Sequence, residues 1–317
     1  MYSFDPARIR LGISSCLLGQ QVRFDTGHRR SHFCTEVLSD YVDYVPVCPE
    51  MAIGMGTPRA SMQLRRDGES IRAITANGED MSKPLIDFGQ RMTTELDHLS
   101  GYIVCAKSPS CGMERVRVYD KEGRNPAKEG VGLYTRQLMD ANPLLPIEEN
   151  GRLNDAPLRE NFIIRVYAYH DWKCVLQEGL SASALVSFHS RHKFLLLAHD
   201  PHSYYQLGPL LSNLSSDLES RARQYIERFM QALRKVATRR RQVNVLQHIQ
   251  GFFKDQLTPS QREELTQVIE RYRLGLVPLM APLTLINHYL REHPNPYLGQ
   301  QRYLNPYPET LALRYGM

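Results

Sequence analysis

The sequence lacks any long apolar run. No stretch approaches the roughly 18 consecutive apolar residues that a membrane-spanning helix needs, in a chain that is 42% hydrophobic and 23% charged. The first residues, MYSFDPARIR, contain no apolar signal core, so we expect the protein to stay in the cytoplasm and away from membranes. Repeats and low-complexity tracts are also missing, as is usual for a globular protein.

Cysteine is scarce, and the pairs from which zinc sites are built are missing. The chain has six cysteines, and no two of them form a CxxC pair. A zinc knuckle is therefore not expected. Because thiols stay reduced in the cytoplasm, disulfide bonds are poor candidates as well. Metal binding or catalysis is the better interpretation of these side chains.

Length and charge divide the chain into two parts. Its 317 residues exceed the size at which a single hydrophobic core usually stops growing, so we expect two domains. Residues 1–155 contain 19 Lys and Arg against 21 Asp and Glu, whereas residues 156–317 contain 20 against 13, which gives formal charges of −2 and +7. The polar, glycine-containing segment 145–155 is the expected boundary, with domains at 1–150 and 156–317.

The first half alternates strand-like and helix-like segments. Short apolar or β-branched runs predict strands at 10–14, 43–47 and 101–106. Helical patterns are found at 31–41, 82–99 and 131–141, the last followed by a short apolar run at 144–148. This alternation predicts an α/β fold with a Rossmann-like parallel sheet and flanking helices.

The second half has helical periodicity throughout, which predicts an all-α domain. Breaks at 199–203 (HDPHS) and 293–297 (HPNPY) predict turns. The predicted helices are 157–176, 182–197, 213–237, 240–255, 259–274 and 279–292.

Three of the cysteines follow the predicted strands. Cys16 and Cys48 come directly after the first two, and Cys111 lies a few residues past the third. The carboxyl ends of parallel strands share one edge, where open α/β folds bind ligands. Three thiolates at that edge without a fourth protein ligand suit an iron–sulfur cluster with one open position. Three unrelated buried thiols are the alternative.

The remaining cysteines have a simpler interpretation. Cys34 lies in a helix-like segment, Cys105 lies within a predicted strand, and Cys174 lies on an amphipathic helix of the second half. We expect each of them to be a packing residue, since free cysteine is among the most buried residue types.

The motifs around the three edge cysteines are recognisable together. SSCLLG with RFDTGH (23–28), VCPEMAIGMGTPR (47–59) and AKSPSCG (106–112) resemble the thiouracil desulfidase family over roughly residues 8 to 150. One departure is MAIGMG, where the family is expected to be richer in glycine. The segments 190–208 and 305–314 resemble a helical domain that occurs alone or fused to the first. The fused arrangement is similar to bacterial desulfidases that act on 4-thiouridine in transfer RNA.

The resemblance assigns roles to five residues. It implies that Cys16, Cys48 and Cys111 hold a [4Fe-4S] cluster whose fourth iron is free. It also implies that Glu50 is a catalytic acid/base and that Ser108 is a catalytic serine. Such an iron can bind the soft sulfur of a thiocarbonyl while water adds to the ring carbon and sulfide leaves without net electron transfer. Apart from the resemblance, a surface carboxylate after a turn is the preferred interpretation of Glu50.

Three polar residues past Cys16 are candidates for substrate binding. Asp25 could accept a hydrogen bond from a ring N–H, while Arg23 and His28 could donate to carbonyl or phosphate oxygens. The alternative is an ordinary polar turn, RFDTGH. Lys107 and Arg59 are weaker candidates.

The basic second half favours transfer RNA as partner, with a thiolated uracil base as the reacting group. Its most basic segment is RKVATRRR at 234–241. The expected function is a tRNA 4-thiouridine desulfidase. The alternatives are a desulfidase of free thiolated bases such as 2-thiouracil, and an iron–sulfur RNA-binding regulator without catalysis.

Overall fold

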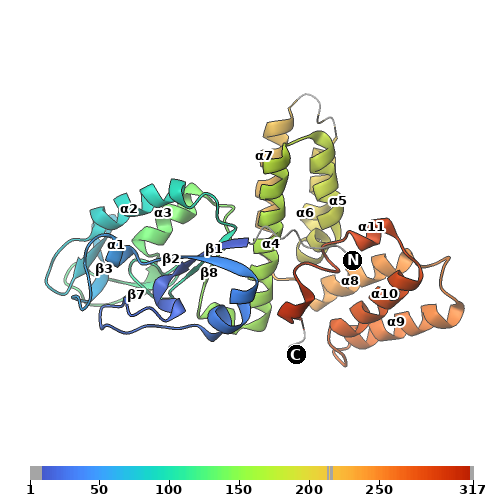
Figure 1. Cartoon of the computed structure of the whole chain (residues 1–317), viewed down its shortest axis with the longest axis horizontal. Helices are drawn as coiled ribbons and strands as arrows, with labels where there is room; N and C mark the ends of the chain where they lie inside the picture. Colours follow the sequence, from blue (N-terminus) through green and yellow to red (C-terminus); the bar gives the residue numbers. More distant parts are fainter. Residues whose placement is uncertain (1–8, 213, 215–216, 315–317) are drawn as a thin grey trace. The chain divides into compact units, whose positions relative to one another are not determined.

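The computed structural model describes residues 9–212, 214 and 217–314, which form two compact units. The boundary between the units falls between Asp155 and Ala156. All described strands lie in the first unit, and the second is built from helices (Figure 1). The predicted fold class, an α/β sheet with flanking helices followed by an all-α part, is confirmed.

One sheet of the first unit is parallel throughout, with the strand order β2-β1-β5-β8. Its strands are β1 (Ile9–Ser14), β2 (Val42–Val47), β5 (Gly101–Val104) and β8 (Ile147–Glu149). Central β1 is apolar and almost wholly buried, as parallel strands covered on both faces are. A side chain at Gly12 would lie 2.2 Å from the ring of Tyr102, so glycine is what lets β1 and β5 pack this closely.

The chain order places a topological switch point in this sheet. β2 lies on one side of β1, and β5 lies on the other. Loops leaving the ends of β1 and β5 therefore diverge in opposite directions and leave a crevice between them, which is the usual ligand position in open α/β sheets.

Two helices that the sequence predicts pack against each other on this unit. They are α2 (Ser82–Glu95) and α3 (Leu133–Ala141), which lie side by side in Figure 1, with Phe88 stacked on Tyr134 at 5.5 Å. The predicted helix 31–41 is instead a π-helical turn followed by a 3₁₀ turn, η2 (Phe33–Val37) and η3 (Leu38–Asp40). Side chains there bond the backbone, for example Thr35 Oγ1 to the Ser31 carbonyl at 3.1 Å, which competes with regular helix.

A second sheet, of order β4-β3-β6-β7, was not predicted. Its strands are β3 (Met62–Asp67), β4 (Ser70–Thr75), β6 (Val116–Tyr119) and β7 (Ala127–Gly130). Strands β3 and β4 form a hairpin whose two-residue turn has Gly68 at φ +63°, a conformation that glycine adopts without strain. Only one face of this sheet is apolar, where Leu64 and Val118 pack into a core with Leu85. Because polar residues interrupt them, these strands do not stand out as apolar runs in the sequence.

The helical unit follows the prediction with two exceptions. Its helices are α4 (Ala156–Glu178), α5 (Ala182–His199), α6 (Pro201–Leu210), α7 (Leu218–Leu233), α8 (Arg239–Gly251), α9 (Pro259–Arg273), α10 (Met280–Glu292) and α11 (Pro296–Gly299). The predicted turns at 199–203 and 293–297 were too long. Each shrinks to a short extended break, after which Pro201 or Pro296 starts a new helix, because proline suits the first helical turn. Part of the predicted start at 213 lies outside the described residues.

No helix within the described part of the chain is long and apolar enough to cross a membrane.

Candidate active site

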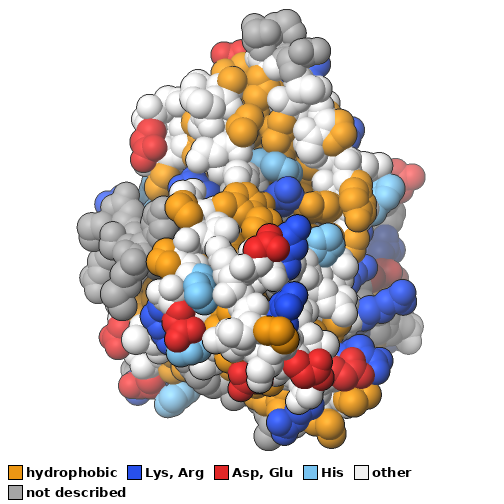
Figure 2. Space-filling view, turned by 90° about the vertical axis from the view of Figure 1, so that its right-hand side faces the viewer, with side chains coloured by type: hydrophobic (Ala, Val, Ile, Leu, Met, Phe, Trp, Pro, Cys, Tyr) orange, Lys and Arg blue, Asp and Glu red, His pale blue; other side chains and the backbone are white. Residues whose placement is uncertain are grey.

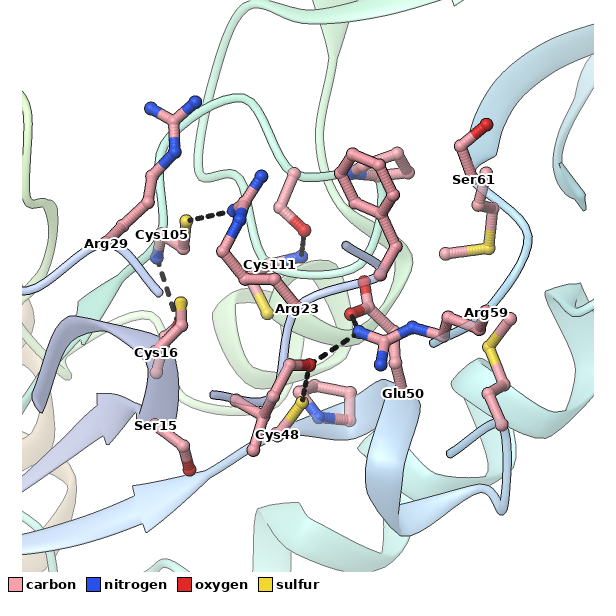
Figure 3. A pocket seen from close by; sticks show the side chains of 18 of the residues that line it. Ser15, Cys16, Arg23, Arg29, Cys48, Glu50, Arg59, Ser61, Cys105 and Cys111 are labelled. Carbon is pink, nitrogen blue, oxygen red and sulfur yellow. Dashed lines mark hydrogen bonds and ion pairs between the residues drawn. The ribbon is translucent and has the colours of Figure 1, made fainter. Parts of the chain in front are cut away.

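The three cysteines that follow strands line one cavity. Cys16 lies in the 3₁₀ turn η1 (Ser15–Leu18) after β1, Cys48 is the residue between β2 and α1 (Pro49–Ala52), and Cys111 lies in the loop after β5. All three border a cavity of about 200 Å³ at the carboxyl edge of the parallel sheet. Figure 3 shows their sulfur atoms facing the same space.

A fourth thiol, Cys105, lines the same cavity, which differs from the packing role expected for it. β5 ends at Val104, so Cys105 is the first residue beyond the strand rather than a residue within it. Its backbone N–H donates to Ser14 Oγ at 3.0 Å, and an Arg23 nitrogen lies 3.8 Å from its sulfur. Cys34 is fully buried, as expected, while Cys174 is only half-buried.

Burial and neighbouring groups shift the pKa values of these thiols in different directions. The hydrogen bond between Cys16 and Cys105, together with burial, raises the pKa of Cys16. The same hydrogen bond, aided by the nearby Arg23, lowers the pKa of Cys105. Burial raises the pKa of Cys48 and of Cys111. Thiols of this kind release their protons when a soft metal binds them.

The cavity offers several thiols, which are the protein ligands of iron–sulfur clusters. Within the described residues, no three His, Cys, Asp or Glu side chains converge closely enough to share one metal ion. Each thiolate of a [4Fe-4S] cluster binds a different iron, so its ligands are spread around a body larger than one ion. Sulfur ligands on the wall of a shared cavity, with Arg23 and Arg29 to offset thiolate charge, fit such a group.

Glu50 projects from the first turn of α1 into this cavity. Its carboxylate forms an ion pair with Arg59 (Figure 3), whose side chain is only 5% exposed. It also accepts a hydrogen bond of 2.5 Å from Ser110 Oγ. Arg59 also donates to the carbonyls of Gly56 and Val22, at 2.7 and 2.9 Å. These bonds fix the position of the carboxylate in the cavity wall.

Ser108 is connected to Glu50 through Ser110. The two serine hydroxyl oxygens lie 3.0 Å apart. Because a carboxylate only accepts, Ser110 uses its proton on Glu50, which leaves Ser108 as the donor to Ser110. Ser108 Oγ in turn accepts from the Cys111 backbone N–H at 3.2 Å. A continuous proton path therefore runs from Ser108 to Glu50.

Helix α3 holds the loop that carries these serines. Its first N–H groups, which have no partners inside the helix, donate to the loop: Leu133 to the Pro109 carbonyl at 3.1 Å and Tyr134 to the Ser110 carbonyl at 3.1 Å. Gly132 precedes them, and a side chain there would come within 2.5 Å of the Ser110 carbonyl. The loop is thus held by its backbone.

The three predicted substrate-binding residues separate in the structure. Arg23 lines the cavity. Asp25 and His28 do not belong to the lining and instead form the turn beside it, Asp25 by accepting from the Gly27 N–H at 3.1 Å and His28 by accepting from the Arg30 N–H at 3.2 Å. Asp25 also lies 3.7 Å from the Arg23 guanidinium and so orients it.

Sequence reasoning missed Ser110 and Cys105 and underrated Arg59. The motif SPSC did contain a second serine, but nothing local showed which of the two would meet Glu50. The arginine at 59 lies at the end of the motif that carries Cys48, which was the available signal.

Comparison with known proteins agrees with this division of the chain. Residues 11–150 match the family model for 2-thiouracil desulfurase, and residues 193–308 match a family described as a protein of unknown function, DUF1722. The match to 2-thiouracil desulfurase therefore falls on the α/β unit with the thiol-lined cavity.

A curated relative is uncharacterized protein YbgA of Escherichia coli (strain K12), 35% identical over 159 residues, which are 50% of this chain and 94% of the relative. The chain belongs to the same family as YbgA. A solved structure, that of the [4Fe-4S]-dependent thiouracil desulfidase TudS, is 24% identical, with a TM-score of 0.39, and covers 47% of this chain and 95% of its own.

Proposed function

We propose that the protein is a [4Fe-4S]-dependent desulfidase that converts 4-thiouridine in transfer RNA to uridine and releases sulfide. The observation that carries the proposal is the cavity itself. It combines several thiols with the hydrogen-bonded path from Ser108 to Glu50, within the residues that match 2-thiouracil desulfurase.

Cys16, Cys48 and Cys111 would hold the cluster. When bound, it supplies a Lewis-acidic iron that takes the soft thio sulfur. The reaction exchanges sulfur for oxygen: a carbon–sulfur bond and water give a carbonyl and hydrogen sulfide, and no electrons are gained or lost.

Glu50 takes a proton from the water that adds to the ring carbon. Arg59 holds the carboxylate toward the cavity, and Ser110 connects it to Ser108. Ser108 faces the cavity, where it positions the water or a polar group of the ring. After the addition, Glu50 returns the proton to the departing sulfide, and Ser110 and Ser108 carry it from the carboxylate toward the cavity.

The size of the cavity favours a single base as the group that enters. Its volume of about 200 Å³, which the substrate would share with the cluster, is below the usual range of pockets for drug-sized ligands, about 300–1,000 Å³. Arg23 would donate to a ring carbonyl, with Asp25 holding the guanidinium. His28, on the same turn, is proposed to contact the ribose or phosphate. A base in folded RNA would have to flip out of its stack to enter.

The charge of the helical unit supports RNA as the carrier of that base. Residues 156–317 have a formal charge of +7. The first turn of α8 contains Arg239, Arg240 and Arg241 and no acidic residue. On the face drawn in Figure 2, Lys and Arg occur in separate groups among Asp and Glu. The contacts with RNA are therefore proposed to be local, at sites such as the start of α8. A cytoplasmic setting, where thiols stay reduced, suits the six free cysteines.

The decisive experiment is anaerobic reconstitution with iron and sulfide, followed by nucleoside analysis of treated transfer RNA and a parallel assay with free 2-thiouracil. We expect loss of 4-thiouridine from the RNA and release of sulfide. Turnover of the free base alone would replace the proposal with the alternative of a free-base desulfidase.

A Glu50→Gln protein separates enzyme from regulator. It should keep its iron and lose turnover by about 10²–10⁴-fold, the usual contribution of general acid–base catalysis. A parent protein that binds transfer RNA without converting it would support the non-catalytic alternative.

A further inference from the structure

We propose that a basic groove beside the cavity, on the catalytic unit itself, binds the RNA backbone that flanks the thiolated base. The inference rests on the proposed function and assigns part of RNA recognition to the first unit, whose formal charge of −2 gives no hint of it. The groove has a volume of about 680 Å³. It shares Met62, Ala106, Lys107 and Pro109 with the wall of the cavity, so the two spaces are adjacent.

Four exposed cations line this groove without acidic partners. They are Lys107, Arg115, Arg117 and Lys128, and among the described residues none of them forms an ion pair. By contrast, Arg152 at the far side is bound to Glu148 and Glu114. The free cations thus form a set that faces the groove rather than a network that stabilises the fold.

The sheet carries an uncompensated pair of like charges. Arg117 of β6 lies directly opposite Lys128 of β7 in the antiparallel register. Like charges in this position destabilise a sheet. A phosphate bound between them would remove the repulsion, and phosphates are spaced regularly along an RNA strand.

The loop cations are held in a conformation that non-glycine residues rarely adopt. Lys107 has φ +63° and Arg115 has φ +54°. Left-handed backbone at such residues costs free energy and is found mainly at functional sites. Both residues border the groove, and Lys107 also borders the cavity, where a phosphate next to the flipped base would lie.

The remaining lining suits RNA rather than a bare anion. Tyr119 lies two residues after Arg117 on the same strand face and offers a ring for stacking. Gln63 has a buried side-chain oxygen that finds no hydrogen-bond partner among the residues the structure describes, which suits a ribose hydroxyl. Two carboxylates also line the groove, but Glu114 is paired with Arg152. Glu149 accepts from the Met113 N–H, and burial raises its pKa.

The size of the groove argues for a polymer. It is more than three times the volume of the cavity, and a free base needs only the latter. The occupant we assign is therefore an unpaired RNA segment, with its phosphates on the four cations and one base in the cavity.

The test is a double variant, Arg117→Gln with Lys128→Gln, in the full reconstituted chain. We expect KM for thiolated transfer RNA to rise at least tenfold and the salt slope of RNA binding to fall by roughly 1.4 to 1.8, for two lost phosphate contacts. Turnover of free 4-thiouridine should stay unchanged. The melting temperature should stay equal or rise, because the repulsion between β6 and β7 is gone.

A matched control is Arg66→Gln with Lys121→Gln, which removes two cations of the same unit that are paired with Glu129 and Asp67 and lie outside the groove. It should leave both substrates unaffected. Unchanged RNA kinetics in the groove variant, or an equal loss on RNA and on free nucleoside, would overturn the inference.

Failure of the proposed function gives a different pattern. If the parent protein converts neither substrate, RNA binding by the same set of proteins decides about the groove. Weaker binding only in the groove variant supports it, and equal binding in all of them rejects it.

Discussion

The four thiols of the cavity differ in the groups that surround each sulfur. Cys105 is the one next to Arg23 and the one whose pKa is lowered, whereas burial raises that of Cys48 and Cys111. Cys16 and Cys105 are hydrogen-bonded to each other. The proposed ligand set leaves Cys105 outside the cluster, as a neighbour of Cys16.

We predict that Cys105→Ser keeps about four irons per chain after anaerobic reconstitution. Cys16→Ser should bind clearly less iron and lose the visible absorbance of the cluster. The measurement is iron content together with the absorption spectrum. Equal loss of iron in both variants would make Cys105 a ligand and would change the proposed open position.

Ser110 is a positioning residue between Ser108 and Glu50. Ser110→Ala should lower turnover by about 10²-fold, the lower end of general acid–base contributions, because it interrupts the proton path. The pH–rate profile should also change, because Glu50 loses the hydroxyl group that links it to Ser108. Iron content should not change. Ser61→Ala, at the rim of the same cavity, is the control and should leave the profile as it is.

Only part of this site was predictable at the residue scale. The three edge cysteines could be placed because strand ends of a parallel sheet meet at one edge. Cys105 could not, since a strand end that differs by one residue decides between core and cavity. The contact between Glu50 and Ser110 joins helix α1 to a loop 60 positions further along the chain, and no local pattern encodes it.

Helix α5 carries three histidines whose side chains face the interior of the helical unit. Burial lowers the pKa of His189 and of His199 to about 4, and it lowers that of His192 as well. His199 donates from Nδ1 to the Lys235 carbonyl at 2.6 Å, which fixes its neutral tautomer. These rings are therefore packed as neutral groups.

We predict that acid destabilises the helical unit below neutral pH. The unfolded chain binds protons at His189 and His199 near pH 6.5, whereas the folded unit does so only near pH 4. Stability is then fully present above pH 6.5 and falls as pH drops toward 4, by about 3 kcal/mol for His199. Melting temperatures between pH 7 and 4.5 measure this. His199→Gln should show a shallower dependence, and an identical slope would contradict the assignment.

The first turn of α8 places its arginines at the positive end of the helix dipole. That position favours acidic groups and is unfavourable for cations. Arg240 is exposed, so its charge there serves the surface rather than the core.

Arg240→Glu should therefore change stability and RNA binding in opposite directions. We expect the free energy of unfolding to rise by about 0.3–1 kcal/mol. Affinity for transfer RNA should fall, with a salt slope smaller by about 0.7 to 0.9 if one phosphate contact is lost. Denaturant unfolding and binding at several salt concentrations measure the two effects. Unchanged RNA affinity would remove α8 from the proposed RNA surface.

At the scale of elements, prediction succeeded where the apolar pattern was strong. Strand β1 is a largely apolar run, and helices of the second half such as α7 have a clear helical period. Strands β3 and β4 were missed because one face of each is polar, although the Asp67–Gly68 pair was a hairpin signal. Segment 31–41 was wrongly predicted as a regular helix, because its Ser and Thr side chains form hydrogen bonds with the backbone.

Over the whole molecule, charge is distributed so that neither unit alone would account for the proposed RNA binding. The helical unit has the net positive charge, and the first unit has four exposed cations along one groove although its formal charge is −2. The net charge of a unit therefore does not reveal a local cluster of cations, because counting residues along the sequence does not show which of them lie together.

We predict that salt distinguishes the two substrate classes. If four cations contact phosphates, a fourfold rise in salt lowers affinity for transfer RNA by on the order of 100-fold. Turnover of free 2-thiouracil should hardly respond, since a neutral base releases no counterions. Kinetics at several salt concentrations measure both. A parallel decline for both substrates would point to an effect on the cluster or the fold instead.

The attachment of the loop 108–111 to α3 has a consequence for how the sequence of this protein can change in evolution. Backbone hydrogen bonds attach the loop to the start of the helix. Replacing side chains of the loop therefore changes the chemistry of the cavity and leaves the backbone conformation of the loop in place. Any larger residue at Gly132 would instead collide with the backbone of Ser110 and Cys111 and displace the loop. Evolution can therefore exchange the side chains of this loop, but it must keep glycine at the junction between the loop and α3.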